Sequence, residues 1–339
     1  MVGIAVLGCG RIGRMHARNV ASHPRARLVT VFDLNASASA SVACELGVKV
    51  ASSLPALLGN PAVEGVLIAS STDTHVDLIV AAVGAGKAVL CEKPIDLDVE
   101  RARVCWREIA VKRPRVMIGF NRRFDPSFRA LKQRIQDGQI GRPELLVITN
   151  RDPAPPSMEF LRHSGGIFHD FTIHDLDLAR YLLGEIVEVT ACGANLIDPS
   201  IGQLGDFDTC AVTLRAEAGA LVQINNSRRC VYGYDQRVEV FGQRGMLRAG
   251  NLRETSVESW SERHTAAQDV LLPVFMERYR AAYVAELDAF IAALEGGGPM
   301  SPDFADGLAA LFLAQAAARS VKTGRCEKPG DQAREPSSE

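Results

Sequence analysis

The sequence predicts an α/β fold in which an N-terminal, doubly wound parallel sheet is followed by an α+β domain with a largely antiparallel, open sheet. Three observations support this prediction. Short β-branched runs alternate with helical segments up to residue 120, as is typical of parallel strands joined by right-handed crossovers. Beyond that point several strand-like segments follow one another with few helices between them. A glycine-rich turn joins the first strand to the first helix.

The first domain is expected to span residues 1–120. Its strands are predicted from β-branched runs at residues 2–7, 28–32, 63–69, 88–91 and 115–119. Helices are predicted from longer segments at residues 12–22, 37–46, 74–84 and 99–111. Such an alternation brings the carboxyl ends of the strands to one edge of the sheet, where ligands of open α/β sheets bind.

The second domain is expected at residues 121–324 and is assigned to substrate binding and oligomer contacts. Its helices are predicted at residues 124–136, 171–183 and 308–318. Its strands are predicted at residues 144–150, 187–194, 209–215, 221–227 and 236–241. Several of these strands alternate polar and apolar residues, which indicates one covered and one exposed face. Residues 325–339 are charged and contain Pro329 and Pro336, so this tail is predicted to be disordered.

The composition argues against several classes of partner. The 339 residues carry a formal net charge of -2, with a pI near 6.4, so the chain lacks the basic surface expected for nucleic acid or an anionic membrane. No apolar run approaches about 18 residues, the length of a membrane span, and no secretory signal pattern is found. The 8 cysteines include no C-x-x-C pair and are interpreted as reduced thiols. We therefore expect a cytoplasmic protein that binds a small polar molecule.

The glycine-rich turn is the candidate phosphate-binding loop. Gly8, Gly10 and Gly13 form a G-x-G-x-x-G pattern that includes Arg11 and Ile12. In this position the first glycine permits a tight turn, the second lets a pyrophosphate approach the backbone, and the third lets helix and strand pack closely. The helix that follows directs peptide N–H groups and a partial positive charge at the phosphates. The pattern, placed between a strand and a helix, predicts a dinucleotide site.

Asp33 predicts which dinucleotide binds. It ends the second strand, twenty positions after Gly13. A carboxylate there accepts hydrogen bonds from the adenosine ribose hydroxyls and repels a 2′-phosphate. Neither Leu34 nor Asn35, which follow it, offers a positive charge to such a phosphate. NAD is therefore favoured over NADP, and the alternative role of Asp33 is to cap the next helix.

Asp170 and His174 are the candidate acid–base pair. They are four residues apart in a predicted helix, so their side chains share one face. A carboxylate beside an imidazole orients the ring and stabilises its protonated form, which makes His174 the natural base for a hydroxyl proton. Lys93 lies at the carboxyl end of a predicted strand, and its ammonium group can stabilise a developing alkoxide.

A metal site is the alternative for the same segment. His169, Asp170, His174 and Asp175 carry suitable ligand atoms. His169 and His174 are five positions apart, however, which separates them around a helix, and the H-E-x-x-H pattern is absent. The sequence therefore predicts no metal.

Five segments together resemble the Gfo/Idh/MocA oxidoreductases and, among them, the inositol dehydrogenase branch. They are Glu92-Lys93-Pro94, residues 71–75 (S-T-D-T-H), residues 119–125 (G-F-N-R-R-F-D), residues 165–175 (G-G-I-F-H-D-F-T-I-H-D) and residues 232–237 (Y-G-Y-D-Q-R). With the glycine loop, the resemblance extends from Gly8 to about Gly245. It implies a Rossmann domain, NAD as cofactor and oxidation of a secondary alcohol of a cyclic polyol.

The resemblance also implies roles for individual residues. Lys93, Asp170 and His174 match the catalytic triad of the family. Beyond the glycine loop and Asp33, cofactor contacts are implied for Ser71, Thr72, His75, Glu92 and Lys93. Substrate contacts are implied for Lys93, Arg122, Asn150, Asp152, Asp170, His174 and Tyr234.

Two parts of this residue set stay open. Residues 151–153 (R-D-P) depart from the family pattern at the substrate strand. The alternative for Asn150 and Asp152 is therefore that each is an ordinary turn residue without a substrate contact. Tyr232 is the alternative to Tyr234, because a strand would point both side chains to the same face.

The reaction implied by the resemblance is oxidation of myo-inositol to 2-keto-myo-inositol (scyllo-inosose) with NAD. The alternatives are a dehydrogenase for scyllo-inositol or a pyranose sugar, and a dinucleotide-binding regulator without turnover. The presence of Lys93, Asp170 and His174 argues against the regulator. We also expect a homo-oligomer, because the helices of the second domain are too few to cover both faces of its sheet. The resemblance points to a tetramer, with a dimer as the alternative.

Overall fold

The computed structural model describes residues 1–330, and the chain forms two compact units. The first contains residues 1–121 and 283–311, and the second contains residues 122–282 and the described residues from 312 onward. The prediction of a single second domain at residues 121–324 therefore needs correction. Its segment 283–311 belongs to the first unit because it packs there: a Cβ atom on Gly65 would lie 3.0 Å from Phe290.

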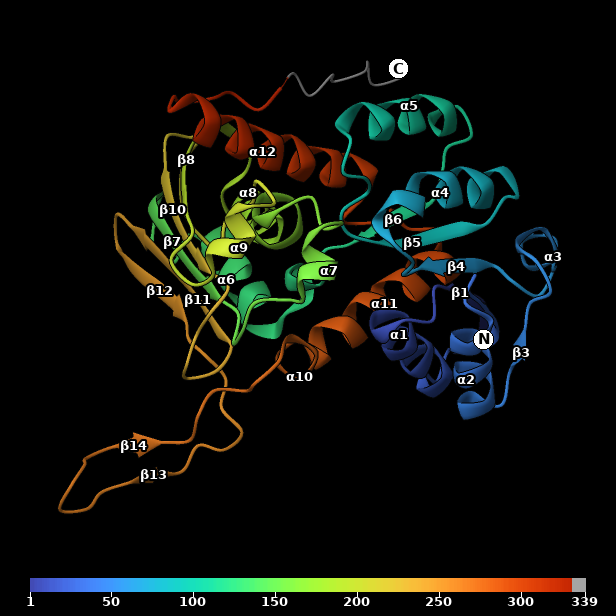
Figure 1. Ribbon diagram of the computed structural model, residues 1–339, viewed down its shortest axis with the longest axis horizontal. Coiled ribbons are helices and arrows are strands. Elements are labelled where there is room, and N and C mark those ends of the chain that lie inside the picture. Colours follow the sequence, from blue (N-terminus) through green and yellow to red (C-terminus); the bar gives the residue numbers. More distant parts are fainter. Residues whose placement is uncertain (331–339) are drawn as a thin grey trace. The chain divides into compact units, whose positions relative to one another are not determined.

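The first unit is built on a six-stranded sheet with the strand order β3-β2-β1-β4-β5-β6 (Figure 1). All of its neighbouring strands pair in parallel. The strands are β1 (Val2–Leu7), β2 (Ala26–Phe32), β3 (Lys49–Val50), β4 (Gly65–Ile68), β5 (Ala88–Glu92) and β6 (Val116–Gly119). Every residue of β1, β4 and β6 is buried, as expected where helices cover both faces of a parallel sheet. This arrangement confirms the predicted doubly wound fold.

Helices cover both faces of this sheet. They are α1 (Arg11–Ser22), α2 (Ala36–Leu46), α3 (Leu54–Leu58), α4 (His75–Gly84), α5 (Val99–Ala110) and α11 (Arg280–Gly296), with short 3-10 turns at Thr72–Thr74 and Asn121–Phe124. Helices α4 and α5 lie on one face, and α1, α2 and α11 lie on the other (Figure 1). Neither the two-residue strand β3 nor the five-residue helix α3 was predicted, because such short segments carry no clear periodicity.

The second unit contains a six-stranded sheet with the order β12-β11-β7-β10-β9-β8. Its strands are β7 (Pro143–Arg151), β8 (Ile186–Ala194), β9 (Thr209–Ala216), β10 (Leu221–Ser227), β11 (Asp235–Gly242) and β12 (Gly245–Ala249). Strands β7 and β10 pair in parallel and the other pairs are antiparallel. Residues of β9 alternate between buried and accessible, so one face of the sheet forms core. The predicted, largely antiparallel sheet is confirmed.

The second unit has fewer helices than the first. They are α6 (Pro126–Gln136), α7 (Met158–Leu161), α8 (Ile173–Leu183), α9 (Pro199–Gly202) and α10 (Phe275–Arg278), while α12 (Phe304–Thr323) contributes residues to both units. A π-helical turn at Phe168–Thr172 leads into α8, so the helix predicted at 171–183 begins differently from the expectation. A small hairpin of β13 (Glu258–Ser259) and β14 (Ala267–Gln268) extends from this unit (Figure 1).

The start of the C-terminal tail is ordered, contrary to the prediction. The backbone of Glu327 exchanges two hydrogen bonds of 2.8 Å with that of Val189, and the Ser320 hydroxyl donates to the Arg325 carbonyl oxygen. Glu327 thus pairs with the edge strand β8 through an isolated antiparallel bridge to Val189. Residues 331–339 of the predicted disordered tail lie outside the described residues. Within the described part of the chain, no helix combines the length and apolar character needed to cross a bilayer.

Candidate active site

The glycine loop has the geometry of a tight turn that leaves space for a ligand. Gly8 has a φ of +91°, and a Cβ atom there would lie 2.4 Å from the Ala69 carbonyl oxygen. A Cβ atom on Gly13 would lie 1.9 Å from the carbonyl oxygen of Gly8, so helix and strand touch at this point. At Gly10, the N-cap of α1, an added Cβ would meet nothing within 4 Å, and no side chain caps the helix. Room beside an uncapped helix N-terminus is what a pyrophosphate requires.

Asp33 is bound to this loop. Its Oδ2 atom accepts a hydrogen bond from the Cys9 N–H at 2.6 Å, and its Oδ1 atom accepts one from the Asn35 N–H at 2.7 Å. The alternative role of Asp33 as a helix cap is wrong, because α2 is capped by the Asn35 side chain, which accepts from the N–H groups of Ser37 and Ala38. The carboxylate therefore sits beside the glycine loop, as a ribose-binding residue requires.

His75 connects two loops at the carboxyl edge of the first sheet. The ring is buried, with Nδ1 2.8 Å from the Pro94 carbonyl oxygen and Nε2 3.2 Å from that of Ser70. Burial lowers the pKa of His75, so the ring is neutral and donates to only one of the two carbonyls. The 3-10 turn Thr72–Thr74, with Ser71 as its N-cap, lies between Ser70 and His75 in the sequence. The His75 ring thus holds the loop after β4 and the loop after β5 together.

The segment after β5 carries the other predicted residues of the first unit. Glu92 ends the strand, and Lys93 follows at its carboxyl end. The Oε1 atom of Glu92 is 2.7 Å from Nε2 of His16, on α1. Arg11 and Ile12 are the first two residues of that helix. One contact thus connects the last residue of β5, which precedes Lys93, to the helix that follows the glycine loop.

In the second unit, Asp170 lies in the π-helical turn and His174 at the start of α8. Asp170 contacts a residue that the sequence analysis did not identify: Nη1 of Arg228 is 3.4 Å from its Oδ2 atom. The same guanidinium places Nη2 3.4 Å from Oδ2 of Asp206, and its side chain is 0% exposed. A buried cation between two carboxylates fixes their positions. Arg228 directly follows the strand β10, and its neighbours in the sequence do not indicate that its side chain is buried.

A second buried ion pair was also not predicted. Arg122 pairs with Asp175, and both side chains are almost completely buried, at 4% and 0% exposed. Asp175 also accepts hydrogen bonds from the side-chain amides of Asn150 and Asn226, at 2.8 and 2.9 Å. The Arg122 guanidinium reaches the Tyr234 hydroxyl at 3.5 Å. The structure thus brings together three predicted substrate residues, Arg122, Asn150 and Tyr234, around one carboxylate.

Both ends of the Asn150 amide are used inside the protein. Besides the bond to Asp175, its Oδ1 atom accepts a hydrogen bond from Gln236, whose own carbonyl accepts from the Tyr279 hydroxyl at 2.9 Å. Asn150 lies in β7 and is fully buried, so it is not a turn residue. Asp152 follows the end of β7, where its N–H donates to the carbonyl oxygen of Ser227 at 2.9 Å. Asn150 is therefore placed to orient its neighbours, whereas Asp152 is at the end of the strand.

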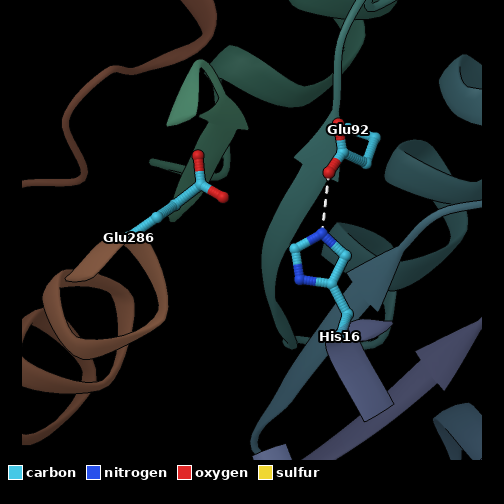
Figure 2. A group of neighbouring side chains, drawn as sticks. All are labelled: His16, Glu92 and Glu286. Carbon is cyan, nitrogen blue, oxygen red and sulfur yellow. Dashed lines mark hydrogen bonds and ion pairs between the residues drawn. The ribbon is translucent and has the colours of Figure 1, made fainter. Parts of the chain in front are cut away.

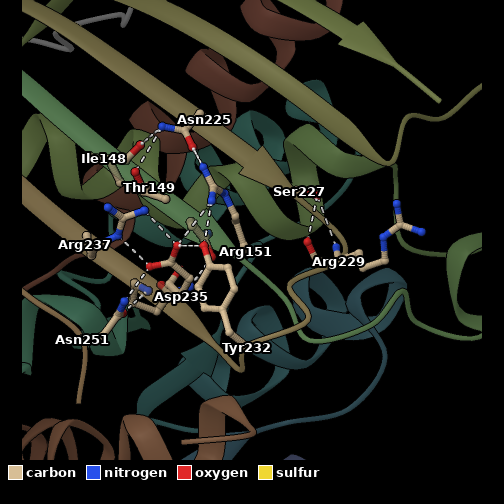
Figure 3. A network of polar contacts seen from close by, with 12 residues as sticks. Ile148, Thr149, Arg151, Asn225, Ser227, Arg229, Tyr232, Asp235, Arg237 and Asn251 are labelled. Atoms are coloured by element: carbon tan, nitrogen blue, oxygen red, sulfur yellow. Dashed lines mark hydrogen bonds and ion pairs between the residues drawn. The ribbon is translucent and has the colours of Figure 1, made fainter. Parts of the chain in front are cut away.

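The two candidate tyrosines point to different surroundings, so the expectation that they share a face is wrong. Gly233 between them has a φ of +113°, and neither tyrosine lies in β11. Tyr234 is buried beside Arg122, whereas Tyr232 is 45% exposed and donates a hydrogen bond to Asp235 at 2.8 Å. The Tyr232 hydroxyl also accepts from Arg151, within the polar network shown in Figure 3. Of the two, Tyr234 is therefore the one that contacts the buried Arg122.

The metal alternative on the catalytic segment has no geometric support. Asp175 is held by Arg122, and Nδ1 of His169 is 3.1 Å from the Gly165 carbonyl oxygen. Among the described residues, the group whose ligand atoms approach one another as metal ligands would is His16, Glu92 and Glu286, in the first unit. The four residues considered from the sequence do not form such a group.

Comparison with known proteins identifies the family. One family model, the NAD-binding Rossmann fold of an oxidoreductase family, matches residues 2–120, and a second, the GFO/IDH/MocA C-terminal domain, matches residues 128–248. An inositol 2-dehydrogenase of Rhizobium meliloti is 47% identical over 326 residues, which are 96% of this chain and 98% of that protein. The crystal structure of a myo-inositol dehydrogenase from Corynebacterium glutamicum matches with a TM-score of 0.94 and 46% identity, covering 97% of this chain and 98% of that one.

A scyllo-inositol dehydrogenase from Lactobacillus casei, solved with bound NAD(H) and scyllo-inositol, matches with a TM-score of 0.90 and 29% identity. The match covers 97% of this chain and 99% of that one. These matches agree with the fold described above. The chain therefore belongs to the Gfo/Idh/MocA oxidoreductase family, with its NAD-binding Rossmann domain at the N-terminus.

Proposed function

We propose that this NAD-dependent oxidoreductase oxidises myo-inositol at one secondary alcohol to 2-keto-myo-inositol (scyllo-inosose). The observation that carries the proposal is the presence in one chain of an NAD loop beside Asp33 and an acid–base pair, Asp170 and His174, next to a buried arginine. Similarity to inositol dehydrogenases over nearly the full length supports a cyclic polyol as substrate. The scyllo-inositol dehydrogenase among the similar structures supports scyllo-inositol as the second candidate.

The reaction converts a CH–OH group to a ketone and releases one proton. When bound, NAD supplies the acceptor for the hydride that leaves the carbon. The residues that would hold it are Gly8, Gly10 and Gly13 at the pyrophosphate and Asp33 at the adenosine ribose. The open space at Gly10 and the contact of Asp33 with the loop fit this assignment. Ser71, Thr72 and Glu92 are assigned to the same cofactor by the family resemblance.

Three residues handle the proton and the charge in this proposal. His174 takes the hydroxyl proton as general base, and Asp170 orients the imidazole and stabilises its cationic form. Arg228 is a positioning residue that holds the Asp170 carboxylate, as their 3.4 Å contact suggests. The ammonium group of Lys93 stabilises the alkoxide that develops on the substrate oxygen.

Recognition of the polyol is assigned to fixed polar groups of the second unit. A ring of hydroxyls requires donors and acceptors that do not move, and the Arg122–Asp175 pair and Tyr234 are buried and connected to one another. Arg122, Tyr234 and Asp152 are proposed to contact hydroxyl groups directly. Asn150 is proposed to act through Asp175, because its own amide groups are already bound.

A homo-oligomer, as a tetramer or a dimer, is part of the proposal. Four apolar residues are paired in register across neighbouring strands of the second sheet: Leu221 with Leu145, Leu145 with Phe241, and Phe241 with Met246. Side chains paired in this way lie on one face, and Leu221, Phe241 and Met246 are 42%, 49% and 50% exposed. An apolar row of this kind favours contact with another subunit. We propose a cytoplasmic location, which the free thiols of all the cysteines support.

A spectrophotometric screen for NADH formation tests the proposal. The protein is supplied with myo-inositol, scyllo-inositol, other inositol isomers and aldopyranoses, each with NAD and with NADP. The expected result is the highest kcat/KM for myo-inositol with NAD. Tight NAD binding without turnover on any polyol or sugar would instead favour a dinucleotide-binding regulator.

A further inference from the structure

A buried cluster in the first unit includes two residues, His16 and Glu286, that have no role in the reaction as proposed above. It consists of His16 on α1, Glu92 at the end of β5 and Glu286 on α11 (Figure 2). One nitrogen or oxygen atom of each side chain lies within 4.8 Å of the others. His16 and Glu286 are 1% and 0% exposed. Three groups able to bind protons thus meet where water has little access.

The hydrogen bond between His16 and Glu92 shows where the imidazole carries its proton. Nε2 of His16 is 2.7 Å from Oε1 of Glu92, and a carboxylate at that distance can only accept. Nε2 is therefore the donor. Nδ1 of the same ring is buried and has no hydrogen-bond partner among the described residues. In the neutral ring, Nδ1 then keeps a lone pair that can accept a hydrogen bond.

Glu286 lies in surroundings that disfavour a negative charge. Its side chain extends from α11 toward the His16–Glu92 pair (Figure 2), and neither carboxyl oxygen has a hydrogen-bond partner among the described residues. Burial raises the pKa of Glu286 well above its usual range, and the charge of Glu92 raises it further. The aromatic ring of Tyr283 packs edge-on against His16, with 5.5 Å between ring centroids, and excludes water from that side.

We propose that Glu286 is a neutral carboxylic acid at neutral pH and that it is a positioning residue. Together with His16, Glu286 holds Glu92 in place beside α1, and the position of Glu92 fixes that of Lys93. The proton on Glu286 removes the repulsion between the two carboxyl groups. Its O–H group faces a ring whose Nδ1 atom lacks a donor, and the opposite nitrogen of that ring holds Glu92. The inference rests on the proposed function only in the role given to Lys93.

The consequence for the reaction follows from the position of Glu92. Its Oε1 atom is held by His16, and its Oε2 atom would be 3.2 Å from a Cβ atom on Gly119 at the end of β6. The side chain is therefore enclosed, and only 15% of it is exposed. If Glu286 were ionised, its negative charge would repel the enclosed carboxylate of Glu92. Since Glu92 precedes Lys93 directly, the displacement would move the ammonium group relative to the cofactor loop.

A divalent cation is the alternative occupant, because an imidazole and two carboxylates are common ligands of zinc and manganese. Because Nε2 of His16 donates its hydrogen to Glu92, a cation could bind this ring only at Nδ1, the atom that the proposal places opposite the Glu286 O–H group. The cation would also need Glu286 to be ionised. The two possibilities therefore differ in the protonation state of one carboxyl group, which can be measured.

Infrared difference spectroscopy on the purified full-length protein is the main test. The expected result at neutral pH is a carbonyl-stretch band of a protonated carboxylic acid in the wild type that is absent in Glu286→Gln. Glu295→Gln is the matched control on the same helix: Glu295 is 40% exposed and pairs with Arg25, so the band should remain. Absence of the band from the wild type, or its persistence in Glu286→Gln, would overturn the assignment. So would a stoichiometric metal, found by elemental analysis, that Glu286→Gln loses.

The positioning role has its own readout. Gln keeps a neutral hydrogen-bond donor at position 286, and Leu does not. Turnover of myo-inositol in Glu286→Leu should therefore be on the order of tenfold lower than in Glu286→Gln, because a small displacement of a catalytic group such as Lys93 lowers the rate strongly. NAD affinity should be similar in the two variants. Equal turnover in both variants would remove the positioning role. The infrared result does not require turnover, so a failure of the proposed function is distinguishable from a failure of this inference.

Discussion

Substitution of Gly10 by Ala should separate cofactor binding from folding. Gly10 has a φ of -68° and a ψ of -168°, which alanine adopts without strain, and its added methyl group would meet no protein atom within 4 Å. The folded protein should therefore tolerate the change. The methyl group would, however, project into the space assigned to the pyrophosphate of NAD.

The two effects have opposite signs. Replacing glycine at a compatible position restricts the unfolded chain and stabilises the protein by about 0.4–1 kcal/mol. A pyrophosphate moved away from the loop loses at least one hydrogen bond of a charged group, which is worth about 1.5–3 kcal/mol. The dissociation constant of NAD should then rise roughly 10- to 150-fold. No other glycine of the loop offers this separation, because a Cβ on Gly8 or Gly13 would lie 2.4 or 1.9 Å from a backbone oxygen.

The assay combines NAD titration, followed by fluorescence quenching, with urea unfolding followed by circular dichroism. Gly250→Ala is the control: its added Cβ would also meet nothing within 4 Å, but it lies in the second unit, so neither NAD affinity nor stability should fall. Unchanged NAD affinity in Gly10→Ala would show that the loop does not bind the pyrophosphate. A large loss of stability would show that the space at Gly10 is needed by the protein itself.

Three further predictions concern the cofactor choice, the base and the buried acid. Asp33→Ser combined with Leu34→Arg should shift the ratio of kcat/KM values toward NADP, and a wild type that already uses NADP equally would refute the role of the carboxylate. His174→Ala should lower kcat by roughly 100-fold or more with little change in NAD affinity, and wild-type turnover should fall at acid pH as the imidazole is protonated. Near wild-type turnover in His174→Ala would make Lys93 the leading candidate for the base. Because the pKa of Glu286 is raised in the folded state, its contribution to stability is complete below its unfolded pKa of about 4.3 and is lost as pH rises toward the folded value. As the pH rises through this range, the unfolding free energy of the wild type should therefore fall relative to that of Glu286→Gln, by up to about 1.4 kcal/mol per pH unit. A difference between the two proteins that does not depend on pH would contradict a raised pKa of Glu286.

Features that depend on neighbouring residues in the sequence were predictable. The glycine loop and Asp33 were identified because strand, turn and helix follow one another directly, and the structure places the carboxylate on the Cys9 N–H group. Most strands of both sheets were found from their β-branched runs and alternation, but the edge strands β3 and β12 were not predicted. The alternative role of Asp33 as the cap of α2 could not be excluded from the sequence, because Asp33 and Asn35 are both good caps and only the backbone geometry decides between them.

Features that depend on pairing across long sequence distances were not predictable. The return of residues 283–311 to the first unit is set by packing of Phe290 near Gly65, and an apolar helix face does not specify its partner. The ion pair of Arg122 with Asp175 joins residues 53 positions apart, and the contact of Arg228 with Asp170 joins residues 58 apart. A charged residue carries no local sign of burial when its partner is remote. These remote pairs are nevertheless what holds the candidate substrate residues in place.

The most direct test of the account is the fate of the hydrogen on the oxidised carbon. The protein is incubated with NAD and myo-inositol that carries deuterium at C2, and the coenzyme and the polyol product are analysed by mass spectrometry. The proposed reaction should give NADH that contains one deuterium atom per molecule, formed together with an equal amount of 2-keto-myo-inositol. NADH without deuterium, or no reaction at C2 while another isomer or sugar is oxidised, would contradict it.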